Sequence, residues 1–305
     1  MSRYLVRRFA NTLIVLIGVA TVAFFLVRLT GDPVAMLLPI DARPEAVERL
    51  RNELGLDRPL PVQYLRFLGA TVQGDFGESL RFNRPALALF TQRFPATAEL
   101  VVYSMLVALL VGIPLGIVAA ARRGTVIDRA VMGVALLGQA VPGFYLGLML
   151  ILVFAVQLGW FPTGGRGTPG QLVMPVAVLA SYLVALIARM TRSSCLEVLG
   201  QDFVRTAHAK GVRGRVVLLK HVLKAALIPI VTLVGLQVGS LFSGAVVTET
   251  VFSWPGIGRL AIEAIYARDF PVVQVVVIMS ATVFVLVNVV VDVLYAVIDP
   301  RIRYV

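Results

Sequence analysis

Six long apolar segments constrain this chain more than any other feature of its sequence. Each can cross the hydrocarbon core of a membrane, which takes about 20 apolar residues in a helix. None alternates as the strands of a barrel do, so we expect an all-α integral membrane protein with six transmembrane helices. The segments run over residues 9–27, 100–121, 130–158, 172–188, 227–247 and 272–298.

The basic residues sort to one side of these segments. If the N-terminus lies inside, six spans return the C-terminus to the inside, and the whole formal net charge of +11 falls on the inner segments. This is what the positive-inside rule requires. The sequence pI of about 10.5 is therefore a topology signal rather than a sign of nucleic-acid binding. No small-residue cleavage site follows the first segment, so we expect it to stay as a span.

Two large loops interrupt the apolar pattern of what we treat as one domain, residues 1–305. Residues 28–99 should lie outside, with helical pieces at 44–54 and 60–72, and residues 189–226 should lie inside. Two prolines, Pro114 and Pro142, should bend the second and third spans.

The inner loop contains the segment QDFVRTAHAKG at residues 201–211. All three lysines and both histidines of the chain lie in this segment or just after it. Asp202 is a good N-cap, and Gly211 suits the left-handed conformation that ends a helix. We expect a short basic helix between them. It would either insert into a groove of a partner or lie as an ordinary basic loop beside anionic headgroups, and the residues alone leave both open.

The pattern Arg-Thr-Ala-x-Ala-Lys-Gly at 205–211 resembles the EAA signature of bacterial ABC importer permeases. More specifically, the chain resembles the first permease subunit of the dipeptide/oligopeptide family, and the resemblance covers essentially all 305 residues. Other ABC permeases have a glutamate at the position of Arg205. Whether Arg205 forms a specific ion pair with the ATPase is therefore an open question. The other matching segments, in the same order, are 7–8, 31–33, 54–60, 74–79, 189–194, 249–258 and 299–301.

The resemblance implies a type I ABC importer permease fold in the bacterial inner membrane. It implies a second homologous permease, two cytoplasmic ATPase subunits, an extracytoplasmic peptide-binding protein and membrane lipid as partners, and no nucleic acid. The cargo would be di- or oligopeptides, or a related solute such as glutathione. ATP and magnesium would be bound by the ATPases, and we expect no cofactor, metal or catalytic residue in this subunit.

Three sets of candidate site residues follow from the motifs and from the polar positions in the spans. The set expected to couple to the ATPase is Asp202, Phe203, Arg205, Thr206, Ala207, Ala209, Lys210 and Gly211. The set expected to line a pathway is Gln139, Gln237, Thr248, Glu249, Asn288 and Asp292. The set expected to dock the binding protein is Gly74, Asp75, Phe76, Gly77, Trp254, Pro255 and Gly256.

Other classes of protein fit the sequence less well. No lysine is followed by Ser or Thr, so the phosphate-binding loop of an ATPase is absent. Both histidines lie in the inner loop, which disfavours an intramembrane enzyme. A secondary transporter or a channel-type subunit that ATP does not drive remains the alternative, because Asp292 and Glu249 lie in or near spans.

Overall fold

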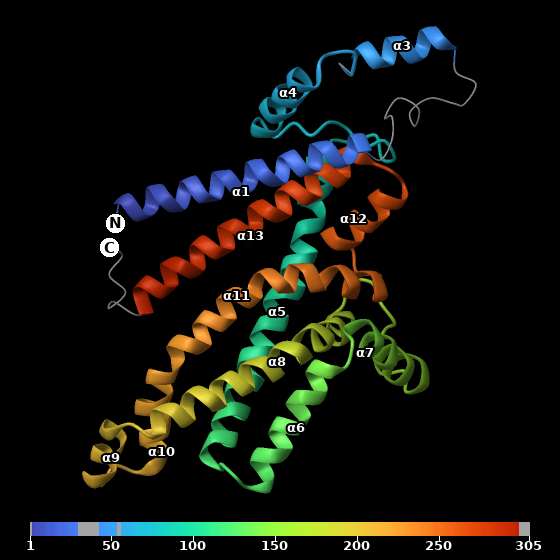
Figure 1. The fold of residues 1–305 in the computed structure, drawn as a ribbon. Coiled ribbons are helices and arrows are strands. Elements are labelled where there is room, and N and C mark those ends of the chain that lie inside the picture. The colour runs from blue at the N-terminus through green and yellow to red at the C-terminus, as the bar shows by residue number, and fades with distance from the viewer. Residues whose placement is uncertain (1, 30–42, 54–55, 299–305) are drawn as a thin grey trace. The chain divides into compact units, whose positions relative to one another are not determined.

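The computed structural model describes residues 2–29, 43–53 and 56–298, and these form two compact units. The first unit combines the described residues up to Phe94 with Leu260–Val285. The second combines Pro95–Arg259 with the described residues from Leu286 onward. The helices of each unit are labelled in Figure 1. The sequence motifs at 31–33 and 299–301 lie outside the described residues.

The first unit is built from two apolar helices and a polar extension. Its cluster of Ala20, Ala23 and Ile278 joins α1 to α13, and Phe67 of α4 packs against the cluster. Figure 1 shows α1 running beside α13. The helical pieces predicted at 44–54 and 60–72 are confirmed as α3 and α4. The elements with residues in this unit are α1 (Ser2–Leu29), α3 (Pro44–Glu53), α4 (Leu60–Val72), the start of α5 (Ala86–Ala121), most of α12 (Ile257–Tyr266) and the first half of α13 (Phe270–Ile298).

The second unit has its core where α5, α8 and α11 meet. Leu100, Leu183, Ile187 and Leu241 are buried there together. Two glycines of α5 allow this packing: a Cβ at Gly116 would overlap the backbone of α8, and one at Gly112 would press on Ile187. The Gly-x-x-x-Gly spacing therefore serves packing within this chain. The other elements of this unit are α6 (Val126–Ala140), α7 (Gly143–Leu150), η1 (Ile151–Gln157), α8 (Pro169–Leu199), α9 (Asp202–Ala209), α10 (Gly214–Val216), η2 (Val217–Val222) and α11 (Leu223–Val251).

The third predicted span is not one helix. In the described part of the chain, five helices are long and apolar enough to cross a membrane, and the sixth crossing is the pair formed by α6 and by α7 with η1, bent by 99° at its break. Pro142 causes the break, because it lacks an N–H and holds Val141 in an extended conformation. The bend that the sequence predicted at Pro142 is confirmed, and its angle is larger than that of an ordinary helix kink. Pro114 lies inside α5 and does not interrupt it.

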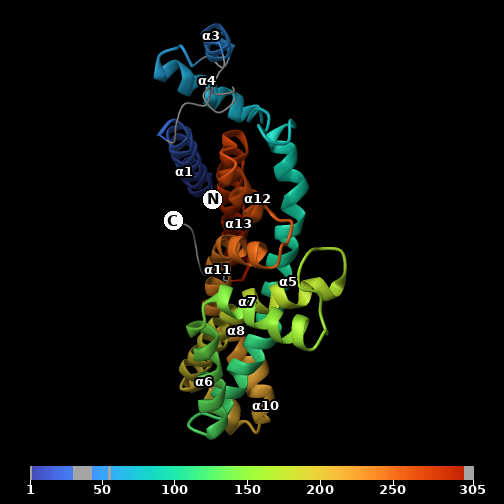
Figure 2. The same ribbon diagram turned by 90° about the vertical axis from the view of Figure 1, so that its right-hand side faces the viewer.

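The second unit has two distinct ends. α9, α10 and the turn between α5 and α6 lie at one end of the α8–α11 pair in both views (Figures 1 and 2). The loop of residues 158–168 leads into the N-terminus of α8, which is the other end of this pair. The charge pattern places the α9 end inside and the loop end outside.

Candidate functional site

The inner end of the second unit carries the short helix that the sequence singled out. α9 covers eight residues, and its capping position is Gln201, whose backbone is extended. Asp202 was expected to be the N-cap, but it is the first helical residue and the helix has no side-chain cap bond. The helix ends at Ala209 with Lys210 as its C-cap, and Gly211 follows with a φ of +76°, which confirms its predicted left-handed conformation.

One face of α9 fixes the helix to its own chain. Val204 is buried in a cluster with Cys195, Val217 and Val222, and Ala207 packs against the same cluster. Ala207 was expected to meet a partner, yet its side chain faces inward because it lies three residues after Val204 on the same helical face. A larger residue at 207 would therefore disturb the chain's own packing first.

The opposite face of α9 is open. The side chain of Phe203 is 42% exposed, although it is aromatic, and Arg205, Ala209 and Lys210 of the same segment are exposed too. Arg205 pairs with Asp202 at 3.4 Å, but both side chains are highly exposed, so this ion pair adds little stability. The exposed ring of Phe203 is available for a contact that the described residues of this chain do not supply.

A second feature of the inner end was missed by sequence reasoning. Asp128 near the start of α6 accepts hydrogen bonds from Nε and Nη2 of Arg192 at 2.6 and 2.8 Å, and from the backbone N–H of Gly124 at 2.9 Å. This bidentate pair ties the α5–α6 turn to α8. The sequence signal was an acid in a basic inner loop, but its partner lies 64 residues away and no periodicity connects the two.

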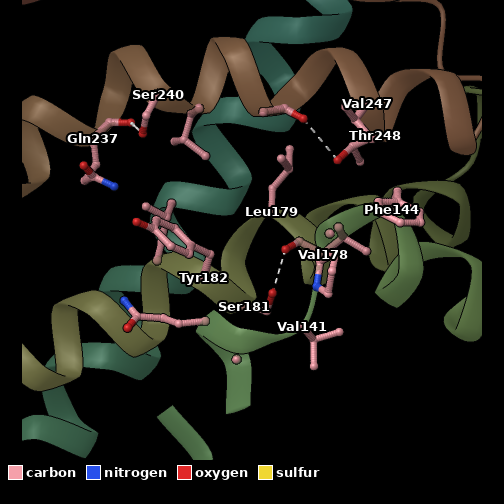
Figure 3. Close-up of a pocket in the computed structure, with 17 residues that line it drawn as sticks. Val141, Phe144, Val178, Leu179, Ser181, Tyr182, Gln237, Ser240, Val247 and Thr248 are labelled. Carbon is pink, nitrogen blue, oxygen red and sulfur yellow. Dashed lines mark hydrogen bonds between the residues drawn. The ribbon is translucent and has the colours of Figure 1, made fainter. Parts of the chain in front are cut away.

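A cavity of about 540 Å³ opens among the α6–α7 break, α8 and α11. Figure 3 shows Gln237 and Ser240 on α11, across from Tyr182 and Ser181 on α8. Three of the six predicted pathway residues, Gln139, Gln237 and Thr248, line this cavity. Its other lining is mostly apolar or glycine, and none of the described residues that line it is charged.

The remaining pathway candidates lie elsewhere. Asn288 is not among the residues that line the cavity. The side chain of Asp292 lies outside the described residues. Glu249 is adjacent in sequence to Thr248 but does not face the cavity, against our expectation, because its carboxylate is fully buried.

Glu249 is the centre of a buried polar cluster near the outer end. The Thr97 hydroxyl donates to its Oε1 at 2.5 Å, and the backbone N–H of Arg259 donates to its Oε2 at 3.0 Å. The same hydroxyl accepts from the backbone N–H of Ile257 at 2.9 Å. A Cβ at Gly256 would overlap the carboxylate. Gly256 is thus required for packing inside this chain.

Two of the expected docking residues, Trp254 and Gly256, are buried inside this chain. Trp254 was predicted to lie at a docking surface, but it is 1% exposed and its indole N–H donates to the carbonyl of Ala96 at 2.9 Å. Only Pro255 of the Trp-Pro-Gly segment is partly exposed. Because its indole is buried, Trp254 does not contribute to the surface of this chain.

The Gly-Asp-Phe-Gly segment of the first unit forms a turn. Gly74 and Gly77 both have positive φ values, of 78° and 79°. Asp75 accepts the backbone N–H of Gly77 at 2.9 Å, and Phe76 packs against the α1–α13 cluster. The side chain of Asp75 remains exposed and open to a partner.

Taken together, these features define a class of protein. Apolar helices that can cross a membrane, a cavity among α6, α7, α8 and α11 and an exposed basic helix at the inner end are features of a membrane transport subunit. Among the described residues, no group of three or more His, Cys, Asp or Glu side chains could hold a metal ion.

Comparisons with known proteins narrow this class. Residues 112–304 match the family described as binding-protein-dependent transport system inner membrane component, and residues 1–101 match its N-terminal family. The dipeptide transport system permease protein DppB of Alkalihalophilus pseudofirmus is 42% identical over 333 residues, and all of both chains is covered. The glutathione transport system permease protein GsiC of Salmonella paratyphi A is 42% identical over 305 residues, again with full coverage.

Solved structures agree on the fold. The inward-facing MetNI methionine ABC transporter matches with a TM-score of 0.59 and 19% identity, covering 70% of this chain and 97% of that chain. The chain belongs to the family of binding-protein-dependent inner membrane transport components. It is a multi-pass permease subunit of an ABC importer in the bacterial inner membrane, as the sequence predicted.

Proposed function

We propose that this chain forms half of the translocation pathway of an ATP-driven importer for di- or oligopeptides, or for a related solute such as glutathione. The observation that carries this proposal is the cavity beside the α6–α7 break. Its volume of about 540 Å³ lies in the range that holds small ligands. The full-length relatives named for dipeptide and glutathione transport support the same class of cargo.

The chemistry of the cavity suits a peptide backbone. Gln139 and Gln237 each offer an amide that donates and accepts, and Ser240 adds a hydroxyl. Such groups can bond to successive peptide units of a cargo without selecting its side chains. The cavity is open on one side, and a second homologous permease would close it.

The exposed face of α9 supports the coupling role. Phe203 would enter an apolar groove of an ATPase subunit, with Arg205 and Lys210 at its rim. Val204 holds the helix on α8 and η2, so a push on α9 would be transmitted to the spans. An extracytoplasmic binding protein would deliver the peptide at the outer end. ATP and magnesium would be held by the ATPases, and this chain would make or break no bond.

The test uses the full complex in proteoliposomes, with the second permease, both ATPases and the binding protein. We expect uptake of radiolabelled dialanine that requires ATP and is lost in Phe203→Ser, while Phe203→Leu retains most of it. The purified Phe203→Ser complex should hydrolyse ATP without responding to loaded binding protein, or should lose its ATPases. Uptake that follows a proton gradient in the absence of the ATPases would instead support a secondary transporter.

A further inference from the structure

A separate polar pocket of about 520 Å³ lies at the outer end of the second unit. It contains one acid and one base: Nε of Arg166 donates to Oε2 of Glu99 at 2.7 Å. Its walls include Tyr103, Leu172 and the ring of Trp254, and the guanidinium of Arg166 lies 5.9 Å from the centre of that ring. None of the six predicted pathway residues is in this pocket.

The loop that carries Arg166 is held firmly in place. The backbone N–H of Gly165 donates to the carbonyl of Phe252 at 2.9 Å, and a Cβ at Gly164 would overlap that carbonyl. Gln171 donates to the carbonyl of Gly164 and accepts from the backbone N–H of Thr168, both at 2.9 Å. The backbone that carries Arg166 is therefore in place before any ligand arrives, and the bond to Glu99 restrains its guanidinium, which lowers the entropic cost of binding.

Both charged groups keep unused bonding capacity. Within the described residues, the Nη nitrogens of Arg166 and the Oε1 atom of Glu99 make no hydrogen bond, and the side chains are 39% and 31% exposed. A partly exposed ion pair contributes little to stability, so the pair is poorly explained as a structural bond. Its charges lie against apolar walls, which strengthen electrostatic attraction to a ligand.

We propose that this pocket receives the zwitterionic ends of the cargo, an inference that rests on the proposed peptide importer function. The free carboxylate of a short peptide would accept from the Nη nitrogens of Arg166. Its ammonium group would donate to Oε1 of Glu99 and lie against the exposed ring of Tyr103. This pocket at the outer end binds a short peptide first, by its charged termini. The uncharged cavity beside the α6–α7 break then binds the peptide backbone.

The first experiment measures binding directly, on the complete complex in nanodiscs without the binding protein. The probes are dialanine and its uncharged analogue N-acetyl-dialanine amide, followed by saturation-transfer NMR. We expect dialanine to bind and the blocked analogue not to bind. Glu99→Gln and Arg166→Gln should each raise the Kd for dialanine by about tenfold, since each loses a charge-assisted hydrogen bond. Arg84→Gln, an exposed arginine of the first unit, serves as the matched control.

The second experiment separates this inference from its alternatives. Binding of loaded binding protein to the complex, and the ATPase activity it stimulates, should be unchanged in both variants, while dialanine transported per ATP falls. Equal binding of dialanine and its blocked analogue would overturn the inference, as would absence of dialanine binding to the wild type. Weaker binding of the binding protein with an intact dialanine signal would assign the pocket to docking instead. If wild-type proteoliposomes take up neither dialanine, nor a longer peptide, nor glutathione, the proposed function itself fails.

Discussion

The hydroxyl of Thr97 and the carboxylate of Glu249 meet at 2.5 Å in a fully buried site, although 152 residues separate them in the chain. This bond joins the outer end of α11 to α5. Thr97→Val keeps the shape of the side chain but leaves the buried carboxylate without that donor. We expect the free energy of unfolding to fall by about 1–3 kcal/mol, measured by denaturant titration of the purified subunit.

The control for this change is Thr250→Val on α11, the helix of Glu249, because the hydroxyl of Thr250 is exposed and, among the described residues, bonds only to its own helix at Val246. It should leave stability nearly unchanged. Equal stability of both variants would show that the Thr97–Glu249 bond contributes nothing.

Gly211 offers a clean test of the coupling helix. Its φ is +76° and a Cβ there would meet no atom, so Gly211→Ala introduces backbone strain without a clash. The strain is about 1 kcal/mol, and it should redirect the chain that leaves α9. We expect normal insertion with a reduced response of the ATPase to loaded binding protein, measured on the reconstituted complex. Gly214→Ala, also in open space but with no positive φ, is the matched control and should behave as wild type.

The cavity predicts a steric block. Ser240 lines it and is exposed, so Ser240→Phe should fill part of the space between α11 and α8. Uptake of peptide should fall while ATP hydrolysis stimulated by the binding protein persists. Leu236→Phe adds a similar bulk on α11 at an exposed position that does not line the cavity, and it should leave uptake intact. If both variants transport equally well, the cavity is not part of the pathway.

The topology predicts which thiols react from each side. Cys195 is 0% exposed and should not react with a thiol reagent. Any labelling can therefore be assigned to a single introduced cysteine. Leu60→Cys, at a 54% exposed position, should react with an impermeant maleimide once the outer membrane is open. Lys210→Cys should react only after the inner membrane is permeabilised. The reverse order would invert the orientation.

The sequence predicted the features that local patterns encode. The lengths of the apolar segments predicted the spans. The glycine after a short basic segment predicted the left-handed backbone conformation of residue 211. Trp254 shows the limit of prediction from local sequence patterns. An aromatic residue near the outer interface has the same sequence signature whether it is exposed or buried, and the carbonyl that holds its indole lies 158 residues away. Glu249 was misplaced for the same reason, because tertiary packing decides which way a side chain faces.

The break in the third crossing has a consequence for solvent. Pro142 supplies no N–H, and the first amide groups of α7 come before any acceptor within that helix. Hydrocarbon does not tolerate such bare backbone. The N–H of Val141 donates to the carbonyl of Leu137 and the carbonyl of Pro142 accepts from the N–H of Leu146, so the groups in question are the first amides of α7, where Gly143 and Phe144 line the cavity. We expect water in the cavity to bond to these amides, so that a cargo entering the cavity would exchange its own hydration for polar surface that is already hydrated.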